Sequence, residues 1–231
     1  MRLNVRRLAV MLATLGLSMS AALAWGQKES VRPGINDSFQ DPNVLEFVER
    51  FEREGREVYD KRDAIVAACN VKAGSTVADV GAGTGLFTRL LAKATGPEGR
   101  VYAVDIADAF VKRVEEKCRE ENIANVTGIV CKVDSAMLPD SGVDLVYICD
   151  TYHHFEFPYR TMSSIHRALR EGGEVVIVDF KRIEGESSDW ILQHVRCGKE
   201  VVIEEVKSAG FELVEEQDLL KDNYMLRFRR K

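Results

Sequence analysis

The sequence predicts an α/β fold with a mostly parallel sheet, on the basis of three observations. Short apolar runs alternate with amphipathic segments along most of the chain, which is the pattern of strands joined by crossover helices. Several of these runs end in an acidic residue. One run turns through three glycines into a helix, in the stretch TVADVGAGTGLFT from Thr76 to Thr88. The 231 residues suffice for one sizeable domain with its own core.

The glycine-rich stretch predicts a site for a nucleotide-type cofactor. Gly81, Gly83 and Gly85 tolerate positive φ and allow a ligand to approach the backbone. The helix that begins at Leu86 offers free N–H groups and a partial positive charge. A dinucleotide fingerprint, GxGxxG, requires glycine at position 86, so the spacing disfavours a nicotinamide-dependent oxidoreductase. A tight turn without a ligand is the alternative interpretation.

A helical cap is predicted before the first strand. The spacing of apolar residues after Asn43 indicates one amphipathic helix, and Asp60 to Cys69 indicates a second. Helices in this position often cover a cofactor cleft. Tyr59 is therefore a candidate to close over a bound ligand, with packing against the sheet as the alternative.

An acid at the end of the second strand is a candidate ribose ligand. This strand is predicted over Arg100 to Val104 and is followed by Asp105. A carboxylate can accept hydrogen bonds from two neighbouring hydroxyls. The alternative is that Asp105 caps the helix that begins near Asp108.

The same periodicities place the remaining elements. The predicted helices are 86–94, 110–121, 159–169 and 201–209, with an insertion and helix in 190–199; the later strands are 126–133, 143–149, 174–180, 211–215 and 224–228. The last two strands are expected to form an antiparallel pair.

The residues after the strand 143–149 are candidates for chemistry. Ligands of open α/β sheets bind outside the carboxyl ends of the strands, near the switch point of strand order. Asp150, His153 and His154 follow this strand directly. Because imidazole titrates near neutral pH, the histidines could act as a general base or orient a substrate. A packed, hydrogen-bonded histidine is the alternative.

Four separated motifs together resemble a known family. The GxGxG spacing, with Asp79 two residues earlier, looks like motif I of the class I S-adenosylmethionine-dependent methyltransferases. VDLVYICDTYHHF resembles motif IV of the ubiquinone and menaquinone type, and the likeness spans Tyr59 to Phe180. The resemblance implies a Rossmann-like seven-stranded methyltransferase fold, mostly parallel, with an antiparallel last strand and an N-terminal helical cap.

The resemblance also implies S-adenosyl-L-methionine as cofactor and a small molecule as methyl acceptor. The cofactor residues it implies are Asp79, Gly81, Gly83 and Gly85 for the methionine part, Asp105 for the ribose, Ile106, Asp134 and Ser135 for the adenine, and Asp150 beside the methyl group. The catalytic candidates are His153, His154 and Asp150, and the candidates for binding the acceptor are Tyr59, Tyr152, His194 and Arg196. The alternative function is a non-catalytic S-adenosylmethionine-binding or sensing module of the same fold. The acceptor atom stays open between oxygen, nitrogen, sulfur and carbon.

The N-terminus predicts a targeting segment. Arg2, Arg6 and Arg7 precede an apolar run from Leu8 to Trp25, and Ala22-Leu23-Ala24 fits a signal peptidase site. We therefore expect a signal peptide over 1–24, a flexible leader over 25–42, a methyltransferase domain over 43–231, and an exported, periplasmic protein. The alternative is an uncleaved inner-membrane anchor with the domain in the cytoplasm.

Charge and cysteine usage exclude other classes of protein. The net charge is −5, and loss of the three N-terminal arginines would make it −8, so no excess of cations exists to bind a phosphate backbone. We expect no nucleic acid partner, and no particular oligomeric state is predicted. The five cysteines, at 69, 118, 131, 149 and 197, show no CxxC and no metal-like spacing. The sequence thus predicts buried free thiols, no disulfide framework and no metal site.

Overall fold

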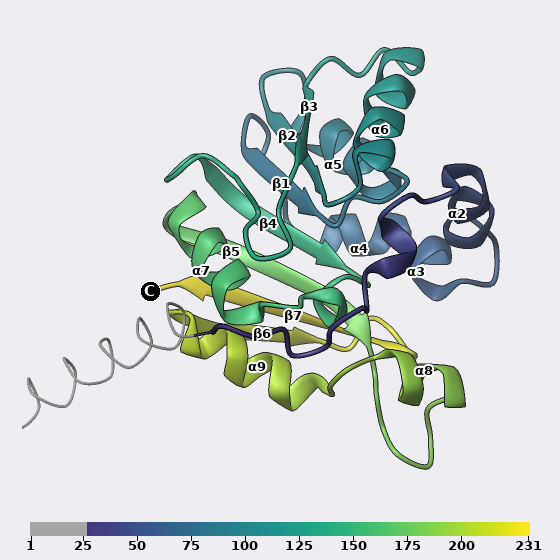
Figure 1. Cartoon of the computed structure of the whole chain (residues 1–231). Coiled ribbons are helices and arrows are strands. Elements are labelled where there is room, and N and C mark those ends of the chain that lie inside the picture. Colours follow the sequence, from purple (N-terminus) through teal and green to yellow (C-terminus); the bar gives the residue numbers. More distant parts are fainter. Residues whose placement is uncertain (1–26) are drawn as a thin grey trace, which may run out of the picture.

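A seven-stranded sheet forms the centre of the computed structural model, which describes residues 27–231 (Figure 1). The strands are β1 (Thr76–Val80), β2 (Arg100–Asp105), β3 (Val126–Val130), β4 (Val143–Cys149), β5 (Leu169–Phe180), β6 (Phe211–Gln217) and β7 (Asn223–Arg230). Their order across the sheet is β3-β2-β1-β4-β5-β7-β6. The first five strands pair in parallel, and β7 is antiparallel to both β5 and β6. The predicted fold class is confirmed.

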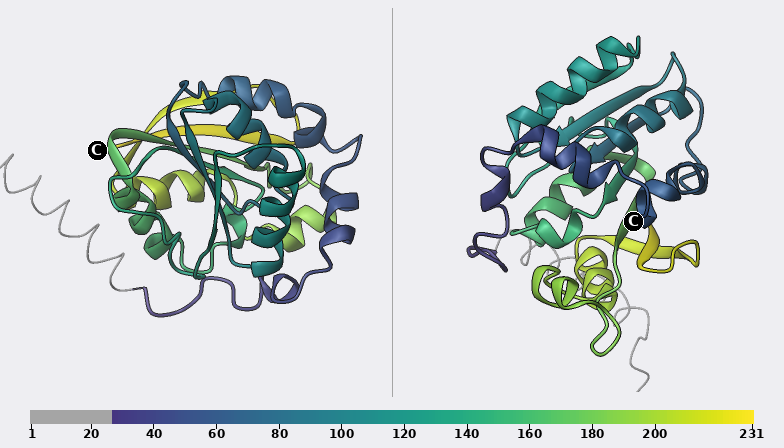
Figure 2. Two further views of the ribbon diagram at one scale, coloured as in Figure 1. Left: turned by 90° about the horizontal axis from the view of Figure 1, so that it is seen from above. Right: turned by 90° about the vertical axis from the view of Figure 1, so that its right-hand side faces the viewer.

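Helices lie on both sides of this sheet (Figure 2). They are η1 (Asp37–Phe39), α2 (Val44–Phe51), α3 (Glu57–Asp60), α4 (Arg62–Ala68), α5 (Leu86–Thr95), α6 (Asp108–Glu120), η2 (Tyr152–His154), α7 (Pro158–Ala168), α8 (Asp189–His194) and α9 (Lys199–Ser208). Residues of α4, α5 and α6 pack on one face, and residues of α7 and α9 pack on the other.

Alternation along the strands supplies two cores, because successive side chains point to opposite faces. Val77 and Val101 belong to the core under α4 and α5, whereas Ala78, Val80 and Val104 belong to the core under α7 and α9. All five side chains are almost fully buried. Central parallel strands covered on both faces require such continuous apolar runs.

Two strand boundaries differ from the predictions by three residues or more. β3 ends at Val130, because its last partner on β2 is Asp105, where β2 itself ends. β5 begins at Leu169, five residues before the predicted start. Leu169 pairs with Val143 before an irregularity in the register, and regular pairing with β4 resumes at Glu174.

The segment predicted as a leader contacts the residues that follow β4. The backbone N–H of Val31 donates to the carbonyl of Glu156 at 2.9 Å, and Asn36 Nδ2 donates to the carbonyl of His154 at 3.0 Å. The predicted signal peptide, 1–24, lies outside the described residues. Within residues 27–231, no helix combines the length and the apolar character needed to cross a membrane.

Candidate active site

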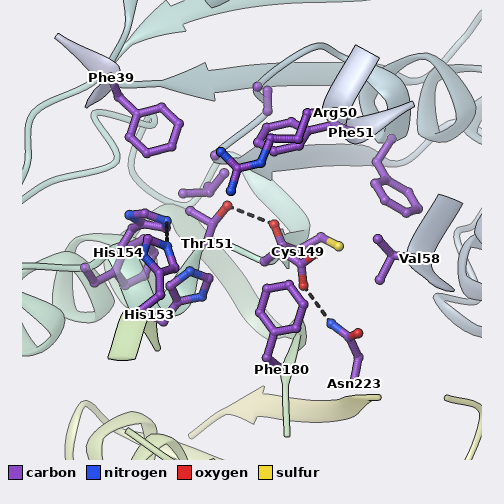
Figure 3. A pocket seen from close by; sticks show the side chains of 18 of the residues that line it. Phe39, Arg50, Phe51, Val58, Cys149, Thr151, His153, His154, Phe180 and Asn223 are labelled. Carbon is purple, nitrogen blue, oxygen red and sulfur yellow. Dashed lines mark hydrogen bonds between the residues drawn. The ribbon is translucent and has the colours of Figure 1, made fainter. Parts of the chain in front are cut away.

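A cavity of about 950 Å³ lies at the carboxyl ends of the parallel strands, within the size range of small-molecule sites (Figure 3). Figure 3 shows Phe39, Arg50 and Phe51 on one side, with His153, His154 and Phe180 facing them. η1 and α2, from the N-terminal part of the chain, thus cover a site built by the sheet.

The glycine turn between β1 and α5 forms one end of the cavity. Gly81 has a φ of 80°, and a Cβ there would lie 2.2 Å from the methyl carbon of Thr151. Gly83 has a φ of 52°, and the Phe51 ring lies 3.9 Å from its would-be Cβ. Both glycines line the cavity, as predicted for the cofactor's methionine part.

Gly85 has a different role from the predicted one, because it is not among the cavity-lining residues. It is the N-cap of α5 with a φ of 80°, and a Cβ would lie 2.8 Å from Val114 of α6. This glycine therefore permits the turn into α5 and the close packing of α6.

Asp79 lines the cavity at the end of β1 and is 2% exposed. The hydroxyl of Thr88 donates a hydrogen bond of 2.6 Å to Asp79 Oδ2. Burial raises the pKa of Asp79 to about 7, and the Thr88 hydrogen bond opposes this shift. A cationic amino group beside this carboxylate would restore its charge.

Asp105 is fixed at the end of β2 by two backbone donors. The N–H of Gly83 donates to Asp105 Oδ2 at 2.8 Å, and the N–H of Ala107 donates to Oδ1 at 2.9 Å. Burial raises the pKa of this carboxyl, and the two hydrogen bonds oppose the shift. Asp105 and Ile106 both line the cavity, where the remaining lone pairs of the carboxylate can accept hydroxyl groups.

Of the three residues predicted to contact the adenine, Ile106 lines the cavity as described above, and the other two differ in position. Ser135 lines the cavity. Asp134 is not among the lining residues, and Arg160 Nη2 lies 2.7 Å from its Oδ2. The sequence shows an acid after β3 but not the arginine on α7 that pairs with it.

Asp150, after β4, lines the cavity, and each of its two carboxylate oxygens has a side-chain partner. Arg56 Nη2 lies 2.6 Å from its Oδ2, and Asn223 Nδ2 donates to its Oδ1 at 2.7 Å. Figure 3 shows the hydrogen bond from Asn223. Arg56 balances the charge of this carboxylate, and Arg56 and Asn223 together fix its position. Its catalytic role stays a prediction.

Three histidines meet at the other end of the cavity. His153 and His154 lie on η2 and His194 ends α8, and one ring nitrogen from each lies within 4.8 Å of the others. His154 Nε2 and His194 Nε2 are 3.3 Å apart. Burial and repulsion from His153 lower the pKa of His154 to about 2 and that of His194 to about 4. Both are neutral at pH 7.

A buried carboxylate orients His153. Asp179 Oδ1 lies 2.7 Å from His153 Nδ1, and its Oδ2 accepts the backbone N–H of His153 at 3.0 Å. Asp179 Oδ1 also accepts the backbone N–H of Phe180, so the carboxylate acts as the acceptor in each of these hydrogen bonds. His153 Nδ1 is therefore the donor of this pair, and the pair fixes the orientation of the ring.

The other predicted acceptor residues do not line the cavity. Tyr152 is fully buried and donates from its hydroxyl to Glu205 Oε2 at 3.0 Å. Arg196 makes two hydrogen bonds to the same carboxylate, at 2.9 and 2.6 Å. Tyr59 packs under the guanidinium of Arg62. These three residues support the structure instead, and only His194 of the predicted acceptor group reaches the site.

Sequence analysis missed several residues of the site. Phe39 lies in the predicted leader, Arg56 between two predicted helices, and Asp179 near the end of β5. An acid closing an apolar run was the available signal for Asp179, as it was for Asp105. Nothing local marks Phe39 or Arg56 as site residues, since their partners at the site, His154 and Asp150, lie far away in the sequence.

The residues fit S-adenosylmethionine. A fixed carboxylate at the end of β2, a glycine turn that a Cβ would block, and a large cavity between them suit a nucleoside with an amino acid tail. Asp79 gives a buried carboxylate beside the same turn.

Comparisons with known proteins agree with this assignment. Residues 78–177 match the family described as "Methyltransferase domain". The ubiquinone/menaquinone biosynthesis C-methyltransferase UbiE of Burkholderia mallei is 25% identical over 118 residues, which are 51% of this chain and 48% of that protein. The chain thus spans about half the length of the curated relatives it matches.

Solved structures share the fold. An S-adenosylmethionine-dependent methyltransferase from Aquifex aeolicus superposes with a TM-score of 0.72 and 22% identity, over 83% of this chain and 100% of that one. A Haemonchus contortus N-methyltransferase in complex with S-adenosylhomocysteine gives a TM-score of 0.64 and 23% identity, over 78% of this chain and 45% of that one.

The sheet order and the solved structures show the fold of a class I S-adenosylmethionine-dependent methyltransferase. Within this fold, residues 78–177 match the "Methyltransferase domain" family.

Proposed function

We propose that this protein methylates a small molecule that binds at the histidine end of the cavity. The observation that carries the proposal is the continuity of one cavity, which touches Asp105 and the glycine turn as well as the three imidazoles. A cofactor held by the first two strands would direct its methyl group toward Thr151 and the histidines.

The bound cofactor supplies an activated methyl group, so that the acceptor's electron pair forms a bond to the methyl carbon while the carbon–sulfur pair stays on sulfur. The chain then contributes mainly position and exclusion of water. Asp105 and the glycine turn fix one reactant. Phe39 and Phe51 cover the cavity from the N-terminal side.

The acceptor end favours a flat, partly apolar molecule. Phe180 and Trp190 lie edge to face with ring centroids 5.6 Å apart, and Phe39 meets His154 edge to face at 5.1 Å. Such aromatic walls suit a planar acceptor. The negative net charge of the chain supports a small molecule over a nucleic acid.

The imidazoles are the groups that contact the acceptor. His154, with a pKa of about 2, is too weak a base to take a proton at neutral pH. His153, held by Asp179, is the fixed point of the cluster. Of the two histidines predicted as a general base, only His153, at the centre of the cluster, stays a candidate.

Formation of S-adenosylhomocysteine tests the proposal. The full chain is incubated with S-adenosylmethionine and a panel of phenols, quinols, amines and thiols, and cofactor binding is measured separately by calorimetry. Product with at least one planar acceptor is expected, and His153→Gln should lose turnover while keeping cofactor affinity. Tight binding without product across the panel would favour the non-catalytic module, and absence of binding would contradict both functions.

We further propose that the protein is exported, on the composition of residues 2–25. Fusing the first 30 residues to a reporter that is active only outside the cytoplasm tests this. An active reporter, on a fusion protein that is shortened and released from the membrane, supports export with cleavage. A full-length, membrane-bound fusion with an inactive reporter would support the anchored, cytoplasm-facing alternative.

A further inference from the structure

We propose that His153, His154 and His194 bind one divalent transition-metal ion of the zinc type, with an open coordination position that takes the acceptor. The three residues are the complete set of metal-ligating groups found together in residues 27–231. That the open position receives the methyl acceptor rests on the proposed function. The ion site itself rests only on the imidazoles.

The spacing of the nitrogens fits such an ion. Two imidazole nitrogens on a tetrahedral zinc, each about 2.1 Å from the metal, lie about 3.4 Å apart. His154 Nε2 and His194 Nε2 are separated by 3.3 Å, and the donor atoms of all three residues lie within 4.8 Å of one another.

The proton positions also fit. A metal ligand must present an unprotonated ring nitrogen. His153 donates its Nδ1 proton to Asp179, which is the arrangement by which a carboxylate orients a metal-binding histidine. His154 and His194 lie in the same cluster, with their Nε2 atoms 3.3 Å apart.

These surroundings decide the kind of metal. Mg²⁺ and Ca²⁺ require several oxygen ligands, whereas imidazole suits zinc and its transition-metal neighbours. The cluster offers nitrogen donors and only one adjacent carboxylate, Asp179, which already accepts three hydrogen bonds. A zinc-type ion fits this donor set, and an alkaline-earth ion does not.

The site has the form of an open metal centre. Three protein ligands with a fourth position facing a cavity are typical of catalytic zinc, whereas structural zinc has four protein ligands. All three histidines line the cavity. Trp190 stacks on His194 with centroids 4.7 Å apart, and Phe39 packs against His154, so that the rings are held in place.

Coordination would give the acceptor a fixed place and lower the pKa of a bound hydroxyl or thiol. The acceptor's proton would then leave to water before its lone pair attacks.

Zinc binding by the full chain, purified without a polyhistidine tag and freed of metal, tests the site directly. Calorimetry with Zn²⁺ alone is expected to give one ion per chain with sub-micromolar affinity, and Co²⁺ is expected to give the visible absorption of a tetrahedral nitrogen site. His194→Gln, on the short surface helix α8, should abolish both signals. His166→Gln is the matched control, because His166 is the remaining histidine of the sequence and packs against Phe211 away from the cavity.

Asp179→Asn tests the positioning role and should weaken zinc binding by about 10- to 100-fold without changing the stoichiometry. Absence of one-to-one binding, or binding that survives His194→Gln, would overturn the metal site and show a packed imidazole cluster or adventitious zinc on cysteines. S-adenosylmethionine binding, measured in the same samples, decides the proposed function separately. If zinc binds but does not change the rate of S-adenosylhomocysteine formation, the role assigned to the open position is wrong.

Discussion

Arg56 Nη2 lies 2.6 Å from Asp150 Oδ2, and this ion pair joins the helical cap to the end of β4. The second carboxylate oxygen accepts a hydrogen bond from Asn223 at the start of β7. Asp150 itself has a φ of 46°, which is uncommon for a residue with a side chain. One buried carboxylate thus connects three parts of the chain beside the cavity.

Replacement of Arg56 should destabilise the protein. Arg56→Met removes the partner of a carboxylate that is 9% exposed, so the free energy of unfolding should fall by about 3 kcal/mol, as for a broken buried pair. Urea denaturation measures this loss. Lys112→Met breaks the exposed pair with Asp108 and should change stability far less than Arg56→Met. Equal effects of the two variants would contradict the role of the Arg56 pair.

Replacement of Asp105 should weaken cofactor binding. Asp105→Ala removes the hydrogen bonds of a charged group to the ribose, so affinity for S-adenosylmethionine should fall by about 5- to 150-fold, or about 1–3 kcal/mol. Calorimetry checks this. Asp108→Ala, three residues later on the exposed start of α6, is the control and should bind normally. Unchanged affinity of Asp105→Ala would remove the ribose assignment.

Gly81→Ala should lower the free energy of unfolding by more than backbone strain alone would. Gly74 has a φ of 77° and nothing within 4 Å of its would-be Cβ, so Gly74→Ala isolates the backbone strain, about 1 kcal/mol. Gly81 has a φ of 80° and adds the contact with Thr151 at 2.2 Å. We expect an additional loss of about 1–3 kcal/mol from this overpacking, measured by thermal and urea unfolding. Matching losses would mean that Thr151 moves aside freely.

Asp79 should make stability depend on pH. Its folded-state pKa of about 7 lies above the ordinary value of 3.8, so the native state binds the proton more tightly than the unfolded chain. The stabilisation by this proton is present at low pH and is lost as pH rises from about 4 to about 7, by up to about 4 kcal/mol. The free energy of unfolding is measured without cofactor for the wild type and for Asp79→Asn. The difference between the two should fall with pH over this range. Asp63 is exposed, so for Asp63→Asn this difference should not change with pH. A difference for Asp79→Asn that does not change with pH would contradict the raised pKa of Asp79.

Much of the fold could be predicted from local sequence. β1 and β4 have the predicted boundaries, because continuous apolar runs bounded by turns are read directly from the chain. β3 and β5 differ at one end, where pairing with a neighbouring strand decides how far a strand extends. The glycine turn and Asp105 were predictable for the same local reason, since each follows its strand immediately.

The acceptor end was less predictable. His153 and His154 were visible beside β4, and His194 was placed near the pocket, but their meeting depends on how α8 folds back over the strand ends. Tyr152 and Arg196 belong to the same two segments and point into the core toward Glu205 instead. Residue type and neighbourhood in sequence do not distinguish these two directions.

The sequence by itself determined the α/β alternation, the glycine turn and the acids that end the strands, because these depend on periodicity and backbone freedom within a few residues. Only the tertiary structure decided that Asp150 is fixed by Arg56 and Asn223, that Gly85 serves packing, and that three imidazoles converge. Those outcomes depend on contacts between segments about 30 to about 100 residues apart, where burial and charge pairing, rather than local pattern, set the position of each side chain.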